Sequence, residues 1–414
     1  MNMFTLTDKT ILRELAKQYA EIAAQDVNAE RKARGQSNNS LRPERPLVWV
    51  DEIPWHEMDI DGFLTLHCES DEARKMERHF RQTLYRWKYM QADMVVDNAY
   101  YIYKAFEDSG IGVEVMEQTR ATDAQSHIVS HHFNDILETE EQVEALCLPV
   151  ITARPDLDEK RVTEVYDVIG DILPVKLCGH GMYHAPWDAI SMLRGVDPIL
   201  IDIIDNPEHL HNIRRKFMEA GLSQYEQMEA QGLLDFNIPS LHCTPPYVDE
   251  LPFHDYDGGT VALRDTWFRG MAQPFSTVSP TMWKEFELDY MRPLMDKCGL
   301  VYYGCCEPLD NLLDMLIDVP NMRKIGISPW ADESVCAPKL GGKYVYARKL
   351  NPAHVATGFD ADIVRAETKA TIELCLKYGC PYEFVLKDIS TVSYKPQNLI
   401  AWVRTVMDTI DEYY

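Results

Sequence analysis

The segment Cys305-Cys306-Glu307 carries the residue types best suited to chemistry. It closes an apolar run, and alternate residues of a strand share one face, so we expect Cys305 and Glu307 together and Cys306 on the other side. A thiolate beside a carboxylate suits a borderline-soft dication such as zinc. Asp388 is the candidate for a further ligand. The alternative is a buried thiol beside a carboxylate that caps a helix.

Two more clusters could contribute ligands or acid–base groups. Glu333 and His354 form one of them, with Asp318 fifteen residues before Glu333. We place Glu333 among the metal candidates, and the alternative is a satisfied polar pair in a loop. His242 and Cys243 are adjacent and face opposite ways in an extended chain, so at most one binds a metal. His242 is the candidate.

Aromatic and polar residues that follow other apolar runs are candidates for substrate binding. Aromatic rings suit an aromatic ligand, although Trp55 also fits a core position. For the two histidines near 180, simple hydrogen bonding at the start of a helix is the alternative. The candidates are Glu52, Trp55, His180, Tyr183, His184 and Trp330.

Eight short apolar runs separated by helical stretches predict the elements that position these residues. Buried parallel strands have this pattern, and eight strand–helix units predict a (β/α)8 TIM barrel, whose active site lies at the carboxyl ends of the strands. Seven of the eight run ends carry Cys, His, Asp or Glu. The expected strands are 47–52, 93–97, 173–178, 234–238, 299–305, 324–328, 344–349 and 383–387, and the expected helices are 70–91, 186–194, 206–231, 280–298, 308–317, 361–378 and 395–412.

We expect one barrel domain over 47–414, with an extension before it and two insertions within it. Residues 1–46 form an N-terminal extension, with one helix expected over 7–35. Residues 98–172 hold insertions, expected as helices and a small hairpin. Residues 239–280 are expected to cross the barrel mouth.

Charge and composition narrow the class of protein. The 414 residues carry a formal charge of −25, which argues against nucleic acid or an anionic membrane as partner. We find no run of roughly 18 apolar residues and no signal peptide, so we expect a cytoplasmic protein. Its ten cysteines are then reduced thiols. The sequence is also compatible with a homodimer.

Six segments over about 40–412 resemble the uroporphyrinogen decarboxylase superfamily, which includes zinc methyltransferases that use corrinoid proteins. LVWVDEIPW resembles the first strand and loop of that family, and VKLCGHGMYHAPWDAISMLRG resembles its glycine-rich strand and Pro-Trp turn. VYYGCCEPLDN stands where zinc members carry His-x-Cys-Gly-Asn. KIGISPWAD, YVYARKLNP and FVLKDIST match the final three strands. The resemblance implies a (β/α)8 fold.

Departures from the family pattern change the expected chemistry. The decarboxylases carry an arginine-rich loop after the first strand, whereas residues 52–57 are acidic here, so porphyrinogen decarboxylation is not expected. The family's distant cysteine ligand corresponds to Asp388. The resemblance implies transfer of a methyl group from a small donor, such as a methoxylated aromatic compound, to a corrinoid protein. Zinc would be held by Cys305, Glu307, Glu333 and Asp388, with Glu307, Asp388 and His242 as the catalytic residues.

Two other classes of function stay open. A metal-free lyase would use Asp388, His180 and His242 in acid–base roles on a small carboxylated substrate. A non-catalytic barrel would bind a tetrapyrrole or corrinoid.

Overall fold

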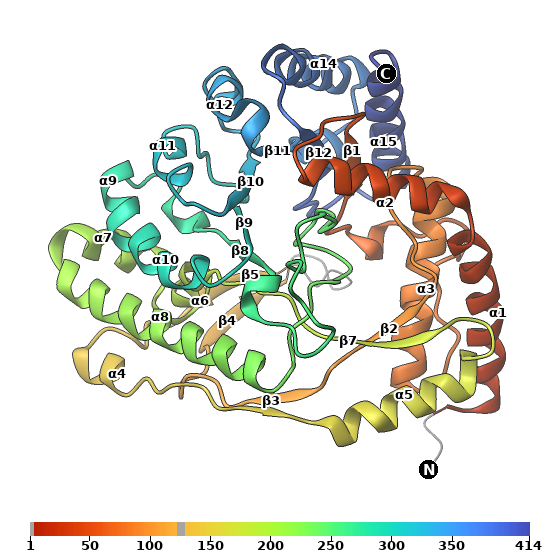
Figure 1. The fold of residues 1–414 in the computed structure, drawn as a ribbon, viewed down its shortest axis with the longest axis horizontal. Coiled ribbons are helices and arrows are strands. Elements are labelled where there is room, and N and C mark those ends of the chain that lie inside the picture. Colours follow the sequence, from red (N-terminus) through yellow and green to blue (C-terminus); the bar gives the residue numbers. More distant parts are fainter. Residues whose placement is uncertain (1–3, 122–128) are drawn as a thin grey trace.

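A central parallel sheet of six strands organises the protein in the computed structural model, which describes residues 4–121 and 129–414 (Figure 1). The strands are short, and the backbone of every one is almost entirely buried, as expected for apolar segments covered on both faces. In sheet order they are β1 (Leu47–Val50), β12 (Tyr382–Leu386), β11 (Val345–Lys349), β10 (Met322–Ile327), β9 (Leu300–Tyr303) and β8 (Trp267–Gly270).

Three two-stranded sheets complete the strand pairing. β2 (Tyr100–Tyr103) pairs in parallel with β7 (Val175–Cys178). Single bridges then connect His180 to Leu234 and His184 to Gly270 on β8. β3 (Phe106–Asp108) pairs with β6 (Ile151–Ala153), and β4 (Glu117–Arg120) with β5 (Ser130–Phe133), both antiparallel. The second of these pairs is the hairpin expected in the insertion.

The strand expectations hold for six of the eight apolar runs. The run at 93–97 forms no strand, because the Asp93 side chain takes the place of a ladder partner and accepts a hydrogen bond from Val48 N at 2.9 Å. The run at 234–238 forms only the bridge at Leu234. β8 lies inside the segment expected to cross the mouth. Within the described residues no ladder joins β1 to β2, so barrel closure stays a prediction.

Helices surround the sheet, most of them on its outer side (Figure 1). Their bounds are α1 (Leu6–Ala23), α2 (Asp26–Asn39), α3 (Asp71–Tyr89), α4 (Glu140–Glu144), α5 (Pro155–Ile169), α6 (Pro186–Arg194), α7 (Val196–Asp205), α8 (Pro207–Ala230), α9 (Pro280–Trp283), α10 (Asp289–Met295), α11 (Leu313–Leu316), α12 (Glu333–Leu340), α13 (Ala353–Ala356), α14 (Ala361–Tyr378) and α15 (Pro396–Asp411).

Three helix expectations need correction. The helix expected over 7–35 is two helices, because Asn28 turns back and its side-chain amide donates to Ile22 O at 2.8 Å, which ends α1. The stretch 280–298 contains a π-helical segment, Lys284–Leu288, between α9 and α10. Of the stretch 308–317, only Leu313–Leu316 is helical. Among the described residues, no helix is long and apolar enough to cross a membrane.

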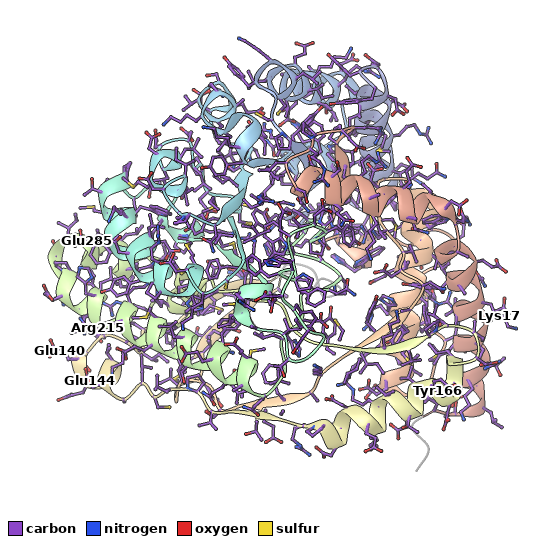
Figure 2. The ribbon with its side chains drawn as sticks, viewed as in Figure 1. Lys17, Glu140, Glu144, Tyr166, Arg215 and Glu285 are labelled. Atoms are coloured by element: carbon purple, nitrogen blue, oxygen red, sulfur yellow. The ribbon has the colours of Figure 1, made fainter. Side chains whose placement is uncertain are left out.

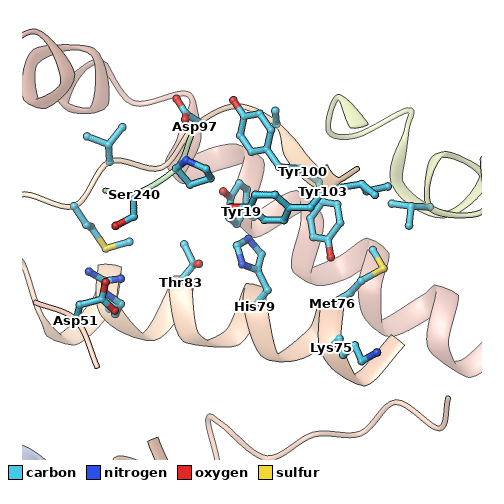
Figure 3. A pocket seen from close by; sticks show the side chains of 18 of the residues that line it. Tyr19, Asp51, Lys75, Met76, His79, Thr83, Asp97, Tyr100, Tyr103 and Ser240 are labelled. Atoms are coloured by element: carbon cyan, nitrogen blue, oxygen red, sulfur yellow. The ribbon is translucent and has the colours of Figure 1, made fainter. Parts of the chain in front are cut away.

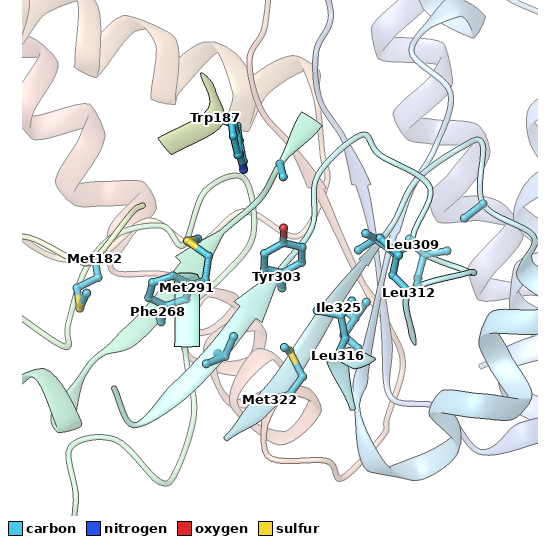
Figure 4. Packing of buried hydrophobic residues seen from close by; sticks show 14 of the residues in the cluster. Met182, Trp187, Phe268, Met291, Tyr303, Leu309, Leu312, Leu316, Met322 and Ile325 are labelled. Atoms are coloured by element: carbon cyan, nitrogen blue, oxygen red, sulfur yellow. The ribbon is translucent and has the colours of Figure 1, made fainter. Parts of the chain in front are cut away.

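Apolar side chains fill the space between the sheet and its helices. Figure 4 shows this packing around β8, β9 and β10, where Phe268, Tyr303 and Ile325 meet side chains from neighbouring helices and loops. A second cluster joins α1, α3 and α5 through Leu12, Phe80 and other buried residues. Charged side chains such as Lys17 and Glu144 lie at the periphery (Figure 2).

An ion pair is buried within the central sheet, between two of its strands. Lys324 Nζ on β10 donates to the two carboxylate oxygens of Glu383 on β12 at 2.9 and 3.1 Å, and to Thr244 Oγ1 at 3.1 Å. Both charged side chains are almost completely inaccessible to solvent. Each charge therefore depends on the other.

Breaking this pair should destabilise the protein, because the remaining charge is left buried without a partner. We expect Lys324→Met to lower the free energy of unfolding by about 3–5 kcal/mol. The double variant Lys324→Met, Glu383→Leu should recover most of the loss, and the exposed Lys17→Met should change little. Guanidinium denaturation midpoints measure all three. A single variant that is as stable as the double variant would contradict this assignment.

Candidate active site

A cluster of sulfur, imidazole and carboxylate groups lies where three chain segments leave the carboxyl ends of the sheet. Cys305 and Cys306 follow β9, and Asp388 follows β12. His242 comes from the segment that precedes β8. We call these four residues the sulfur cluster. Cys305 is fully buried, whereas Asp388 is exposed, so the cluster opens to solvent on one side.

The four side chains are in direct contact. Cys305 Sγ lies 3.7 Å from Cys306 Sγ and 3.8 Å from His242 Nε2. The Cys306 thiol donates to Asp388 Oδ2 at 2.6 Å. Cys305, Cys306 and Asp388 each offer a ligand atom within 4.8 Å of the others. The sequence expectation that Asp388 and Cys305 lie together is met.

A lysine occupies the centre of this arrangement. Lys387 Nζ donates to Cys305 Sγ at 2.9 Å and lies 3.2 Å from His242 Nε2. The carboxylates of Glu52 and Asp388 are both 3.4 Å from the same nitrogen. The ammonium therefore neutralises the negative groups of the cluster.

Glu307 points elsewhere, although the strand alternation predicts it beside Cys305. β9 ends at Tyr303, and Gly304 has φ +97°, so the chain turns before the cysteines and the alternation no longer applies. The Glu307 carboxylate accepts from Ala272 N at 3.1 Å and from Cys305 N at 2.9 Å. Glu307 therefore stabilises the loop through these two hydrogen bonds. Cys306 occupies the position beside Cys305 that the alternation predicts for Glu307.

The backbone around the cluster adopts uncommon conformations. Glu52, His242, Cys243 and Asp388 all have positive φ, between 44° and 67°. Positive φ is rare for residues other than glycine and is often found at functional sites. At Cys243 the turn brings the thiol to 3.5 Å from Glu52 Oε1, where it donates to the carboxylate.

The charges of the cluster favour one thiolate. The Cys306 thiol has one proton, which can be shared between Asp388 and Cys305, and its hydrogen bond to Cys305 holds the pKa of Cys305 well below its ordinary value, with help from the positive charges of Lys349 and Arg269. The same contact raises the pKa of Cys306, and burial adds to that. Cys305 is then the thiolate and Cys306 the thiol.

Neighbouring groups respond to that thiolate. Burial lowers the pKa of His242, although its contact with Cys305 opposes this, so the imidazole is neutral. Burial also opposes the charge of Lys387, but the negative charge of Cys305 outweighs it and raises the lysine pKa. Burial and the charges of Glu307 and Cys305 raise the pKa of Asp188 to about 6.

Two of the predicted substrate-binding residues lie at the sulfur cluster. Glu52 accepts a hydrogen bond from Asp388 N at 2.9 Å. The ring of Tyr183 lies 5.2 Å from that of His242, and its side chain is 43% exposed, so it is accessible beside the cluster. These contacts are compatible with the role that the sequence predicts for both residues.

The two other predicted histidines are engaged in packing. His180 Nε2 contacts Lys104 O at 2.8 Å, and the ring stacks on Tyr103. Burial lowers the pKa of His184 to about 3, so it is uncharged, and its ring packs near Tyr225. Both fit the alternative of local hydrogen bonding and packing.

Glu333 is held away from the sulfur cluster by contacts of its own. It pairs with Arg348 at 2.9 Å and accepts hydrogen bonds from Tyr346 and Thr371. His354 lies 3.2 Å from Glu367, which also contacts Arg348. Glu333 and Glu367, the partner of His354, thus contact the same arginine, so Glu333 and His354 are both engaged in polar contacts, as in the alternative, although no described contact joins them to each other.

The remaining predicted residues show no contact with the sulfur cluster among the described interactions. Trp55 packs edge-on against Tyr85 at 5.9 Å, next to the main core. Trp330 is 66% exposed. The backbone carbonyl of Asp318 accepts a hydrogen bond from the Arg292 guanidinium at 3.4 Å.

Sequence reasoning missed the cations of the site. Lys387 was adjacent to a predicted residue, Arg269 lies within an otherwise apolar strand, and Lys349 ends β11 directly after Arg348. Lys349 Nζ donates to Tyr302 Oη at 3.0 Å and to Gly304 O at 3.2 Å. A basic residue inside an apolar run was the available signal, because lysine and arginine are rarely buried without a partner.

The donor atoms fit a borderline-soft metal ion. Ligand atoms of a tetrahedral zinc site lie roughly 3.3–3.8 Å apart, given metal–ligand distances of about 2.0–2.3 Å. The separations of Cys305 Sγ from Cys306 Sγ and His242 Nε2, 3.7 and 3.8 Å, fall at the upper end of that range. Lys387 contacts two of the same atoms, so a metal ion requires its ammonium to move aside.

Comparisons with known proteins were made by sequence and by structure. No family model and no curated protein matches the sequence. Among solved structures, the chain is similar to a methyltransferase from Methanosarcina mazei, with a TM-score of 0.49 and 11% sequence identity. The alignment covers 93% of this chain and 99% of that chain.

The titration of Cys305 provides a test of the site electrostatics. In metal-free protein, we expect ultraviolet thiolate absorbance at neutral pH that disappears in Cys305→Ser. Because the pKa of Cys305 is lowered, the signal should fade only on acidification. Cys306→Ala removes the hydrogen bond and should move the titration to higher pH, whereas Cys306→Ser keeps a donor. Titration of Cys305 near the ordinary value of 9.0 would contradict this picture.

Proposed function

We propose that the chain is a methyltransferase that moves a methyl group from a small methylated donor to the cobalt of a corrinoid protein. We further propose that the six-stranded sheet, the β2–β7 pair and the two bridges form a (β/α)8 arrangement with an opening between β1 and β2. The resemblance of the strand-end segments to corrinoid-dependent zinc methyltransferases supports the reaction class. The partner, the donor and the metal are all parts of this proposal.

The observation that carries the proposal is the donor set of the sulfur cluster. Two sulfurs, an imidazole nitrogen and a carboxylate oxygen meet at the carboxyl end of a parallel sheet, where enzymes of this architecture place their chemistry. Cys305, Cys306 and Asp388 would hold zinc, and His242, next to Cys305, could complete the set. Glu307 and Glu333 are left out, because each is engaged in other contacts.

The reaction needs a good leaving group. Zinc supplies Lewis acidity toward the donor oxygen when bound. In the transfer, the C–O bond of the donor breaks and the methyl carbon takes an electron pair from Co(I). The oxygen keeps the electron pair of the broken C–O bond. Lys387 retains its proton and places a positive charge where negative charge develops. Tyr183 lies beside the cluster, where it can contact the donor.

Metal binding is the first test. Protein purified in medium supplemented with zinc should contain about one zinc per chain, measured by elemental analysis. Cys305→Ser should lose most of it, whereas Cys147→Ser, an exposed cysteine remote in sequence, should not. Lys387→Met should bind zinc at least as tightly, because the ammonium competes for the same donor atoms. Wild-type protein without any divalent metal would overturn the metal assignment.

Methyl transfer is the second test. Enzyme, methylated donor and a reduced corrinoid protein should together convert Co(I) to methyl-Co(III), followed by its absorption spectrum. Cys305→Ser and His242→Ala should each lower the rate by at least about tenfold, in keeping with the loss of a metal ligand. Cys147→Ser is the matched control. A broad donor panel that yields no methyl-cobalt with several corrinoid proteins would overturn the proposed reaction.

A metal-free lyase is the second candidate, and one observation favours it. The Lys387 ammonium lies at the cluster centre and could pair with a substrate carboxylate. The acid–base set expected from the sequence is reduced, because His180 is engaged in packing. Release of CO2 from a carboxylated substrate by metal-free enzyme would favour this candidate.

A further inference from the structure

A cavity of about 520 Å³ lies beside β1 and β2, the two strands that no described ladder joins. One wall is the face of α3 that carries Met76, His79 and Thr83, spaced three and four residues apart. Figure 3 shows this wall with the side chains that face it. Among the residues described as lining the cavity, none belongs to the sulfur cluster.

Aromatic rings dominate the opposite wall. The imidazole of His79 rises from α3 toward Tyr19 and Tyr100, at centroid distances of 5.8 and 5.6 Å (Figure 3). Tyr103 lies next to them, and its side chain is 42% exposed. Further tyrosines at 101 and 247 line the same space. Such a wall offers flat apolar faces together with hydroxyl groups.

Several polar groups of the lining have no partner. Tyr19 is 5% exposed, and no described residue forms a hydrogen bond with its hydroxyl. The Trp49 indole N–H is buried and unpaired, in a side chain that is 6% exposed. No described residue bonds to the His79 ring nitrogens, and burial lowers its pKa to about 4, so the ring is neutral. Buried polar groups normally have partners.

The charged groups of the lining are already engaged with protein partners. Arg86 donates to Val50 O at 2.8 Å, and Arg161 donates to Tyr103 O at 3.3 Å. Asp97 pairs with a lysine of α2 at 3.5 Å, and Glu72 pairs with a lysine one turn along α3 at 2.7 Å. A ligand therefore meets uncharged donors and acceptors between aromatic rings, and Arg86 and Arg161, each with one bond to a backbone carbonyl, keep further N–H donors for a ligand oxygen.

We propose that this cavity binds an aromatic compound that carries hydroxyl or methoxyl groups. Ring faces would stack on the tyrosines and His79, and ring oxygens would pair with the Tyr19 hydroxyl and a His79 ring nitrogen. A cavity of roughly 150 Å³ accommodates benzene. A volume of about 520 Å³ therefore admits a ring with several substituents or a two-ring compound.

The position of the cavity links it to the sulfur cluster. Asp51 and Ser240 lie at the end of the cavity away from Met76 (Figure 3). Glu52 directly follows the first of them, and His242 comes two residues after the second. A methoxyl group at this end is thus held next to the cluster, and this placement rests on the proposed function. The aromatic donor would then bind here and not at Trp55 or Trp330.

Binding of 2-methoxyphenol to the whole protein tests the proposal, by calorimetry and by quenching of tryptophan fluorescence. We expect saturable binding that methoxycyclohexane, which lacks the aromatic ring, does not reproduce. Thr83→Phe and Ala99→Phe each fill the cavity and should abolish binding while circular dichroism stays unchanged. Tyr19→Phe should weaken it roughly three- to tenfold through loss of one hydrogen bond. Tyr166→Phe, exposed on α5, is the matched control.

The outcomes separate this site from the proposed reaction. Cys305→Ser should retain 2-methoxyphenol binding while losing zinc and methyl transfer. Wild-type protein that binds the probe but contains no metal would leave the aromatic site standing and overturn the metal assignment. No binding to 2-methoxyphenol or to a two-ring analogue would overturn the aromatic site, as would binding that both filling variants leave unchanged.

Discussion

The contact between the Cys305 thiolate and the Lys387 ammonium is the interaction on which the site depends. A buried thiolate is costly without positive neighbours, and a buried ammonium is equally costly without negative ones. Lys349 and Arg269 extend the positive charge behind the thiolate. The strands that carry these cations are fixed by the parallel sheet, so the sheet positions the charges before any ligand arrives. Such an arrangement of fixed charges is what electrostatic catalysis requires.

Much of the sheet could be predicted from the sequence. Runs such as LVWV at 47–50 and EFVLK at 383–387 are apolar on both faces, which is typical of buried parallel strands. The carboxyl ends of such strands meet at one edge, so the proximity of Cys305 and Asp388 followed from their places in the chain, whereas His242 follows a run that forms no strand. Their chemical roles stay predictions.

What the sequence did not reveal depends on contacts between distant residues. The alternation of side chains along a strand did not extend to Glu307, because Gly304 turns the chain with a positive φ. The presence of a glycine in a sequence does not by itself predict its backbone angle. The run around Asp93 has the apolar pattern of a strand but forms none, because the Asp93 side chain accepts the hydrogen bond from Val48 N. Lys387 becomes meaningful only when Cys305, eighty-two residues away, lies against it.

The unpaired edge of β1 has a consequence for how this protein can change over evolutionary time. Isolated contacts occupy this edge in place of a strand ladder: Asp93 donates its backbone N–H to Val48 O and accepts from Val48 N through its side chain, and Arg86 donates to Val50 O. The wall of the adjoining cavity is therefore built of side chains and not of backbone ladder. Point substitutions on α3 and β2 can reshape that wall while the six paired strands keep their register. Single mutations can thus change the ligand preference with little loss of stability of the fold.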